Sequence, residues 1–137
     1  MSYLIDTNVI FELRKGRRCN PHVASWFSGV AEDEIFLSVL TIGEIRRGIE
    51  RIQTRDSKGA SALNRWLKAI TETFTDRILP VDQAVAEEWG RINVPNPLPV
   101  IDSLLAATAR IHGLSLVTRN TKDVARTGVD CLNPFDL

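Results

Sequence analysis

The chain is poor in the residues that form disulfide, redox or zinc sites. Its 137 residues include two cysteines, Cys19 and Cys131, which lie far apart and without CxxC spacing. The two histidines, His22 and His112, have no second histidine three or four residues away. These spacings favour free thiols over a redox pair and argue against a zinc site. If a metal binds, it should be a hard cation held by carboxylates.

Long apolar runs and an excess of one charge sign are also absent. No run approaches the roughly 18 apolar residues of a membrane span, and the N-terminus lacks the blocks of a signal peptide. We therefore expect a cytoplasmic protein with no membrane contact. Seventeen Lys and Arg balance seventeen Asp and Glu, which argues against a dedicated non-specific nucleic-acid binder but allows a local basic patch. Neither GxxxxGK[ST] nor GxGxxG occurs, which argues against a nucleotide-fuelled enzyme.

Short apolar runs typical of buried strands alternate with helical patterns along the chain. The strand-like runs cover residues 3–5, 34–38, 77–82, 114–118 and 129–132. Helical patterns cover residues 9–13, 21–30, 39–52, 63–74, 83–92 and 100–112, with a polar break at 56–62. This alternation predicts one α/β domain over residues 1–137, with a mostly parallel central sheet covered on both faces.

Asp6 lies where the first predicted strand ends and a helix begins. In open α/β sheets the carboxyl ends of the strands form the rim where ligands bind. A charge buried there is costly unless it meets a cation or hydrogen-bond donors. Two interpretations are open, because Asp6 either only caps the next helix or belongs to a site at the rim.

Three further acids have the same two interpretations. Asp102 lies in the first turn of the most apolar helix, where the helix dipole favours a carboxylate by only roughly 0.3–1 kcal/mol. Desolvation costs several kcal/mol, so Asp102 either faces solvent or has a partner. Thr41-x-x-Glu44 fits a capping box, which would explain Glu44 structurally. Asp123 follows the strand at 114–118 and either caps the next turn or shares the rim with Asp6.

Carboxylates that converge at one rim would repel one another strongly without a cation between them. Mg²⁺ or Mn²⁺ removes that repulsion, keeps some of its waters and can bind phosphate oxygens. Asn120, in the turn before Asp123, could add an oxygen ligand or a hydrogen bond. With no glycine-rich phosphate loop present, the constellation indicates metal-assisted hydrolysis of a phosphodiester.

At these residues the sequence resembles the PIN-domain ribonucleases, and specifically the VapC-type toxins of toxin–antitoxin pairs. The resemblance covers essentially the whole chain, and the tail Asn133-Pro134-Phe135 is similar to the FitB-like branch. The motifs are Leu4-Ile5-Asp6-Thr7-Asn8-Val9-Ile10, Leu37-Ser38 followed by Glu44-Ile45-Arg46-Arg47-Gly48, Asp102-Ser103-Leu104-Leu105-Ala106-Ala107-Thr108-Ala109, and Val117-Thr118-Arg119-Asn120 with Asp123.

The resemblance implies a three-layer α/β/α PIN-like domain and a Mg²⁺-dependent endoribonuclease, with Mn²⁺ as a possible substitute. It also implies a homodimer and neutralisation by a small DNA-binding antitoxin of the VapB type. Carried over by position, Asp6, Asp102 and Glu44 hold the metal, and Asp123 completes the catalytic set. Relatives also place an acid at the position of Asn120, which leaves strict two-metal catalysis open here.

Further residues receive supporting or binding roles. Thr7, Thr118 and Asn120 would orient ligands or phosphate, and Arg46 and Arg119 would position the RNA backbone. The antitoxin would insert an arginine into the acidic site. Its amphipathic segment would lie in an apolar groove between the early helices. The residues expected to form this groove are Ile10, Leu13, Ile45 and Ile49.

Two alternatives and one expectation about assembly complete the predictions. The amide at Asn120 keeps open a catalytically weak PIN-like module that acts through a DNA-binding partner. The other alternative is a phosphotransfer domain: the haloacid-dehalogenase type would need an acid where Asn8 stands, and the receiver type would need paired acids and a late strand-end lysine that the sequence does not offer. Apolar faces suggested by the bulky residues Trp26, Phe27, Trp66 and Trp89 exceed what a small chain buries easily, which favours a homodimer.

Overall fold

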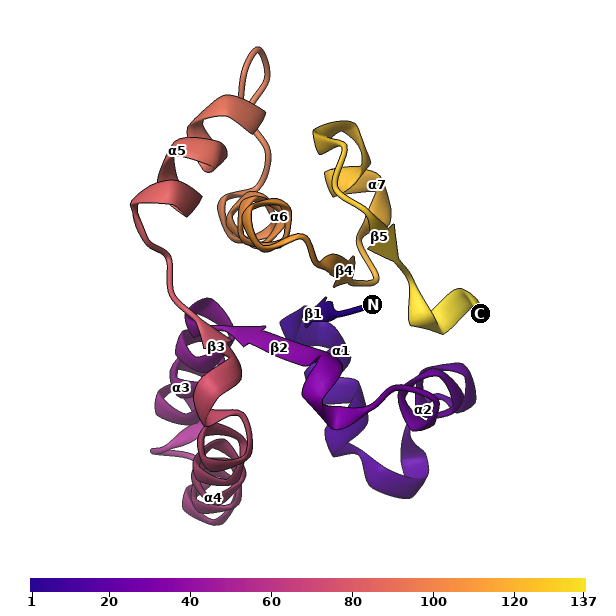
Figure 1. The fold of residues 1–137 in the computed structure, drawn as a ribbon. Coiled ribbons are helices and arrows are strands. Elements are labelled where there is room, and N and C mark those ends of the chain that lie inside the picture. The colour runs from indigo at the N-terminus through magenta and orange to yellow at the C-terminus, as the bar shows by residue number, and fades with distance from the viewer.

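A five-stranded parallel sheet runs through the middle of the computed structural model, which describes residues 1–137 (Figure 1). Its strands lie in the order β3-β2-β1-β4-β5, and every neighbouring pair is parallel. The strands are β1 (Tyr3–Ile5), β2 (Ile35–Ser38), β3 (Ile78–Leu79), β4 (Ser115–Val117) and β5 (Cys131–Leu132). All five carboxyl ends therefore share one edge, as the alternating sequence pattern predicted.

Seven helices cover the sheet, with four on one face and three on the other (Figure 1). One face carries α1 (Thr7–Arg14), α2 (Pro21–Ser28), α3 (Val39–Ile52) and α4 (Ser57–Thr73). The other face carries α5 (Gln83–Ile92), α6 (Val100–His112) and α7 (Thr121–Val124). This arrangement confirms the three-layer α/β/α class. No helix combines the length and the apolar character that a membrane span requires.

Two hydrophobic cores, one on each face of the sheet, explain why β1 is apolar throughout. Leu4 packs in the core that includes Leu105 of α6 and Leu116 of β4. Ile5 packs in the opposite core with residues of α1, α3 and α4. Successive side chains of a strand point to opposite faces, so a strand covered on both faces needs apolar residues at both positions.

The start of α4 and the cap of α3 differ from expectation. Helix α4 begins at Ser57 rather than near Leu63, because Asp56 caps it by accepting from the Gly59 N–H at 2.9 Å. The first turns of α4 are mostly exposed and polar, so hydrophobic periodicity does not reveal them. Ser38 caps α3 by accepting from the Leu40 N–H at 3.0 Å. The predicted capping box at Thr41 is therefore wrong, and Thr41 is fully buried.

The large aromatic residues are accommodated within the chain, contrary to the reason given for a homodimer. Trp26 packs edge-on against Tyr3 with ring centroids 5.2 Å apart. Trp89 donates from Nε1 to the Ser103 hydroxyl at 2.9 Å. The large apolar side chains that do remain exposed are mainly valines, among them Val100, which is 59% exposed.

Candidate active site

Asp6 lies at the centre of the carboxyl edge of the sheet and is 5% exposed. Its Oδ1 accepts from the backbone N–H of Thr7 at 2.6 Å. Its Oδ2 accepts from the Thr118 hydroxyl at 2.7 Å and from the Asn8 amide at 3.1 Å. Asp6 therefore caps α1 and is also fixed from the end of β4, so the two interpretations of this residue hold together.

Glu44 reaches the same place from α3 through Thr7. The Thr7 hydroxyl donates to Glu44 Oε1 at 2.6 Å and lies 3.1 Å from the Thr41 hydroxyl. Arg47, one turn further along α3, approaches the other Glu44 oxygen at 4.0 Å. Thr7 thus links the first turn of α1 to α3 and sets the orientation of the Glu44 carboxylate.

Electrostatic interaction joins Asp102 to the other acids. Burial raises the pKa of Asp102, and the negative charges of Asp6, Asp123 and Glu44 raise it further. Burial also raises the pKa of Asp6, while the hydrogen bonds from Thr118, Thr7 and Asn8 act in the opposite direction. Acids from four separate segments of the chain therefore share one region of negative potential.

A pocket of about 300 Å³ opens between these acids, and we call it the acidic pocket. It brings together three of the four predicted acids with two of the three supporting residues. Its lining consists of Asp6, Thr7, Asn8, Phe11, Glu44, Ile101, Asp102 and Asn120.

Two predicted residues lie just outside the acidic pocket. Thr118 is buried behind Asp6, and its hydroxyl also accepts from the Asn120 N–H at 3.1 Å. Asp123 is exposed in α7 and acts on Asp102 through its charge.

The donors in the acidic pocket fit a hard divalent cation. Carboxylate and amide oxygens are the ligands that Mg²⁺ prefers, and Asn8 Oδ1 is buried without a hydrogen-bond partner. No group of three or more His, Cys, Asp or Glu side chains is arranged to enclose an ion. Water and other oxygens would complete the shell of a bound cation, since Mg²⁺ commonly keeps several waters.

Asn8, Phe11 and Ile101 line the pocket without having been predicted as site residues. Asn8 lies in the first turn of α1, directly after Thr7. Phe11 follows Thr7 by four residues, and this helical spacing places both on one face of α1. That spacing was a usable signal for Phe11, whereas the orientation of Asn8 toward Asp6 required the structure.

The two arginines expected to position RNA do not line the acidic pocket. Arg46 donates to the Asn64 side chain at 3.0 Å and pairs with Glu50 at 3.8 Å, so it faces α4. The guanidinium of Arg119 lies 3.7 Å from the centre of the Phe135 ring.

The expected antitoxin groove at the early helices needs correction. Three of these side chains are at most 5% exposed, because they point into the core beneath α1 and α3: Ile10 (5%), Ile45 (0%) and Ile49 (2%). Burial excludes these three side chains as a docking surface, and Leu13 is half-buried. A groove of about 660 Å³ lies instead between α3 and α4. This α3–α4 groove is lined by Val39, Ile42, Gly43, Arg46, Asn64, Leu67, Lys68 and Thr71.

Comparison with known proteins gives a family match over most of the chain. The family described as PIN domain matches residues 3–129. Toxin FitB of Neisseria gonorrhoeae is 30% identical over 96% of this chain and 97% of its own length. VapC ribonuclease Y4jK of Sinorhizobium fredii is 26% identical, with 97% of each protein covered.

Solved structures agree with the arrangement described above. The crystal structure of FitAcB from Neisseria gonorrhoeae matches with a TM-score of 0.90 and 30% identity, covering 98% of this chain and 99% of that one. A toxin–antitoxin complex from Klebsiella pneumoniae matches with a TM-score of 0.68 and 28% identity, covering 99% of this chain and 100% of that one.

Proposed function

This chain belongs to the PIN domain family, and we propose on that premise that it is a metal-dependent endoribonuclease, the toxin of a toxin–antitoxin pair. Its relatives include one named as a toxin and one named as a VapC ribonuclease, and PIN-domain nucleases of this kind are metal-dependent in general. The observation that carries the proposal is the convergence of Asp6, Glu44 and Asp102 on one pocket at the carboxyl edge of the sheet. Residues 1–137 form the whole catalytic unit in this proposal.

In this function Asp6 and Asp102 hold Mg²⁺ or Mn²⁺, with Glu44 bound directly or through water. When bound, the cation supplies a water of lowered pKa for attack on phosphorus and stabilises the charge that develops on the phosphate. Asp123, outside the pocket lining, adds to the negative potential that attracts the cation. Hydrolysis of an RNA phosphodiester bond follows from this donor set.

The threonines hold the acids in position before any ligand arrives. Thr118 fixes one oxygen of Asp6, and Thr7 fixes one oxygen of Glu44. Because Thr118 also accepts from the Asn120 N–H, the turn after β4 is tied to the same carboxylate. Such fixed hydrogen bonds reduce the reorganisation that the acids need during the reaction.

The test is loss of RNA cleavage in variants that keep the fold. Asp6→Asn and Asp102→Asn should each abolish cleavage, because each removes a charged oxygen ligand. Asp33→Asn is the matched control, since Asp33 is exposed in the turn before β2, at the opposite end of the strand. Full activity in EDTA, or in either pocket variant, would contradict the proposal.

An antitoxin partner is part of the same proposal, and the matched complex from Klebsiella pneumoniae is a toxin–antitoxin complex. The α3–α4 groove combines the half-buried apolar side chain of Ile42, above the buried Leu67, with the cationic Arg46 and Lys68. It therefore suits an amphipathic antitoxin segment with acidic residues along one side. An arginine further along the antitoxin would pair with the carboxylates of the acidic pocket. A ribonuclease toxin meets RNA and antitoxin in the cytoplasm, which we propose as its location.

The exposed apolar residues beside the acidic pocket support a homodimer. Val39 at the start of α3 is 40% exposed and lines a small hollow together with Ile101. Val100, the neighbour of Ile101, is 59% exposed at the start of α6. We propose that this apolar face is covered by a second copy of the chain.

A further inference from the structure

A second polar cavity, remote in the fold from the α3–α4 groove, has a volume of about 500 Å³. Three arginines from separate segments line it, and we call it the arginine pocket. Arg91 comes from α5, Arg110 from α6 and Arg126 from the turn after α7. Val94 and Pro95 of the loop between α5 and α6 form an apolar part of its wall.

A single buried carboxylate holds two of these arginines. Glu88 is 9% exposed and accepts from Arg91 Nε at 3.1 Å and from Arg110 Nε at 2.6 Å. Arg110 also donates to the Thr127 carbonyl at 2.7 Å, and Arg126 donates to the Asn96 carbonyl. Two guanidinium groups thus pair with one carboxylate and the third, Arg126, has no carboxylate partner, so the cavity carries a net positive charge.

Many donors of the arginine pocket remain available for a ligand. Each guanidinium has five N–H donors in a fixed fork, which matches the oxygens of a phosphate group. The bonds to Glu88, Thr127 and Asn96 use only one or two donors of each arginine. Because these bonds also hold the side chains in place, little ordering is needed when an anion binds.

The proposed RNA substrate requires such a cationic site away from the acids. The acidic pocket carries three carboxylates, with Asp123 close by, and these repel a polyanion, while the chain as a whole has zero net charge. Affinity for RNA comes largely from cationic side chains that contact phosphates. A local concentration of arginines is therefore needed to hold RNA near the acids.

Two short segments connect the arginine pocket to the acidic site. The loop from Val94 to Pro99 leads directly into α6, whose first turn carries Asp102. Asp123 of α7 precedes Arg126 by three residues. We propose that the arginine pocket binds phosphates of the RNA backbone at some distance from the scissile bond. This inference rests on the proposed function and adds a substrate-positioning site to it.

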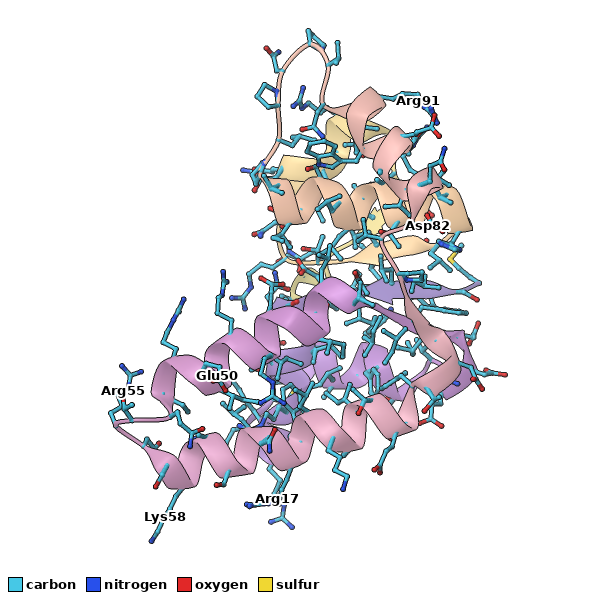
Figure 2. The ribbon with its side chains drawn as sticks, turned by 90° about the vertical axis from the view of Figure 1, so that its left-hand side faces the viewer. Arg17, Glu50, Arg55, Lys58, Asp82 and Arg91 are labelled. Atoms are coloured by element: carbon cyan, nitrogen blue, oxygen red, sulfur yellow. The ribbon has the colours of Figure 1, made fainter.

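The experiment compares two double variants with equal loss of charge. Arg91→Gln/Arg126→Gln removes two of the three arginines of the pocket and leaves the Arg110–Glu88 pair intact. Arg17→Gln/Arg55→Gln is the matched control. Figure 2 shows Arg55 at the lower left and Arg17 at the bottom, both far from Arg91 at the upper right. All four side chains belong to exposed residues.

The readout is the salt dependence of binding to fluorescein-labelled single-stranded RNA of mixed sequence, measured by anisotropy in EDTA. Each phosphate contact contributes about 0.7 to the slope of log affinity against log salt concentration for single strands. The pocket variant should lose about 1.4 from that slope, and the control should match the wild type. In Mg²⁺, the KM for a long RNA should rise with kcat unchanged.

The outcomes separate this inference from the proposed function. If the wild type cleaves RNA and both double variants keep its slope, or lose it equally, the inference is overturned and the proposed function stands. If the wild type neither binds nor cleaves RNA, both are overturned. Loss of antitoxin affinity with RNA binding unchanged would assign the pocket to the protein partner and also overturn the inference.

Discussion

The hydroxyl of Thr118 is the single group whose removal should disturb Asp6 most selectively. It is buried, donates to Asp6 Oδ2 at 2.7 Å and accepts from the Asn120 N–H at 3.1 Å. Thr118→Val keeps the branched shape and removes both bonds. A hydrogen bond to a charged group contributes about 1.5–3 kcal/mol to stability. Asn120 is exposed, so its N–H can turn to water at small cost. We expect a loss of about 2–3 kcal/mol in the free energy of unfolding.

The loss should depend on pH, because the hydroxyl stabilises the ionised carboxylate. Burial raises the pKa of Asp6 and the Thr118 hydrogen bond lowers it, so Thr118→Val raises this pKa further. For a carboxyl whose folded pKa lies above its unfolded value, stability is highest below the unfolded pKa and falls as pH rises through the folded pKa. Because Thr118→Val raises the folded pKa of Asp6 further, stability falls by more in the variant as pH rises. Its cost should be full at neutral pH and smaller at about pH 4.

Urea denaturation followed by circular dichroism, in EDTA at both pH values, measures the effect. Thr108→Val is the matched control, since Thr108 is also buried and its hydroxyl donates to the Leu104 carbonyl at 2.8 Å. That bond has a neutral acceptor, so its loss should cost about 0.5–1.5 kcal/mol and be independent of pH. A cost for Thr118→Val no larger than the control, or equal at both pH values, would refute the reasoning.

Three further predictions address charge, partner and assembly. Burial and neighbouring acids raise the pKa of Asp102, so the ionised side chain destabilises the fold as pH rises. Asp102→Asn removes this charge and should raise the melting temperature in EDTA at neutral pH. The gain should be smaller in acid, where Asp102 is protonated. An unchanged or lower melting temperature would contradict this. Arg46→Glu/Lys68→Glu should weaken antitoxin binding in calorimetry, whereas Lys58→Glu, beyond the groove near the start of α4 (Figure 2), should not. Val100→Arg should shift the protein from dimer to monomer in sedimentation. The measurement should use tens of micromolar protein, a concentration above an ordinary dissociation constant of roughly 10⁻⁶ M. A wild-type monomer at that concentration would count against the dimer.

The alternating sequence pattern was sufficient for the fold class and for the edge of the sheet at which the acids lie. Buried strands are apolar at consecutive positions, and residues that follow parallel strands must share one edge. Asp6 and Asp123 could therefore be assigned to that edge from the sequence. Asp102 could be identified as a site residue because a carboxylate in an apolar helix is costly to desolvate unless it has a partner. These inferences depend only on near neighbours in the chain.

Other features depended on contacts between distant parts of the chain. The Thr118–Asp6 bond joins residues 112 positions apart and exists because β1 and β4 are neighbours in the sheet. The stripe of Ile45 and Ile49 predicted an apolar helix face, but periodicity cannot tell a face that meets the core from one left for a partner. The arginines around Glu88 carry no local motif at all. Periodicity in the sequence shows which side of a helix or strand is apolar. Only the packing of helices and strands decides which residues contact that side, and which partners surround an isolated charge.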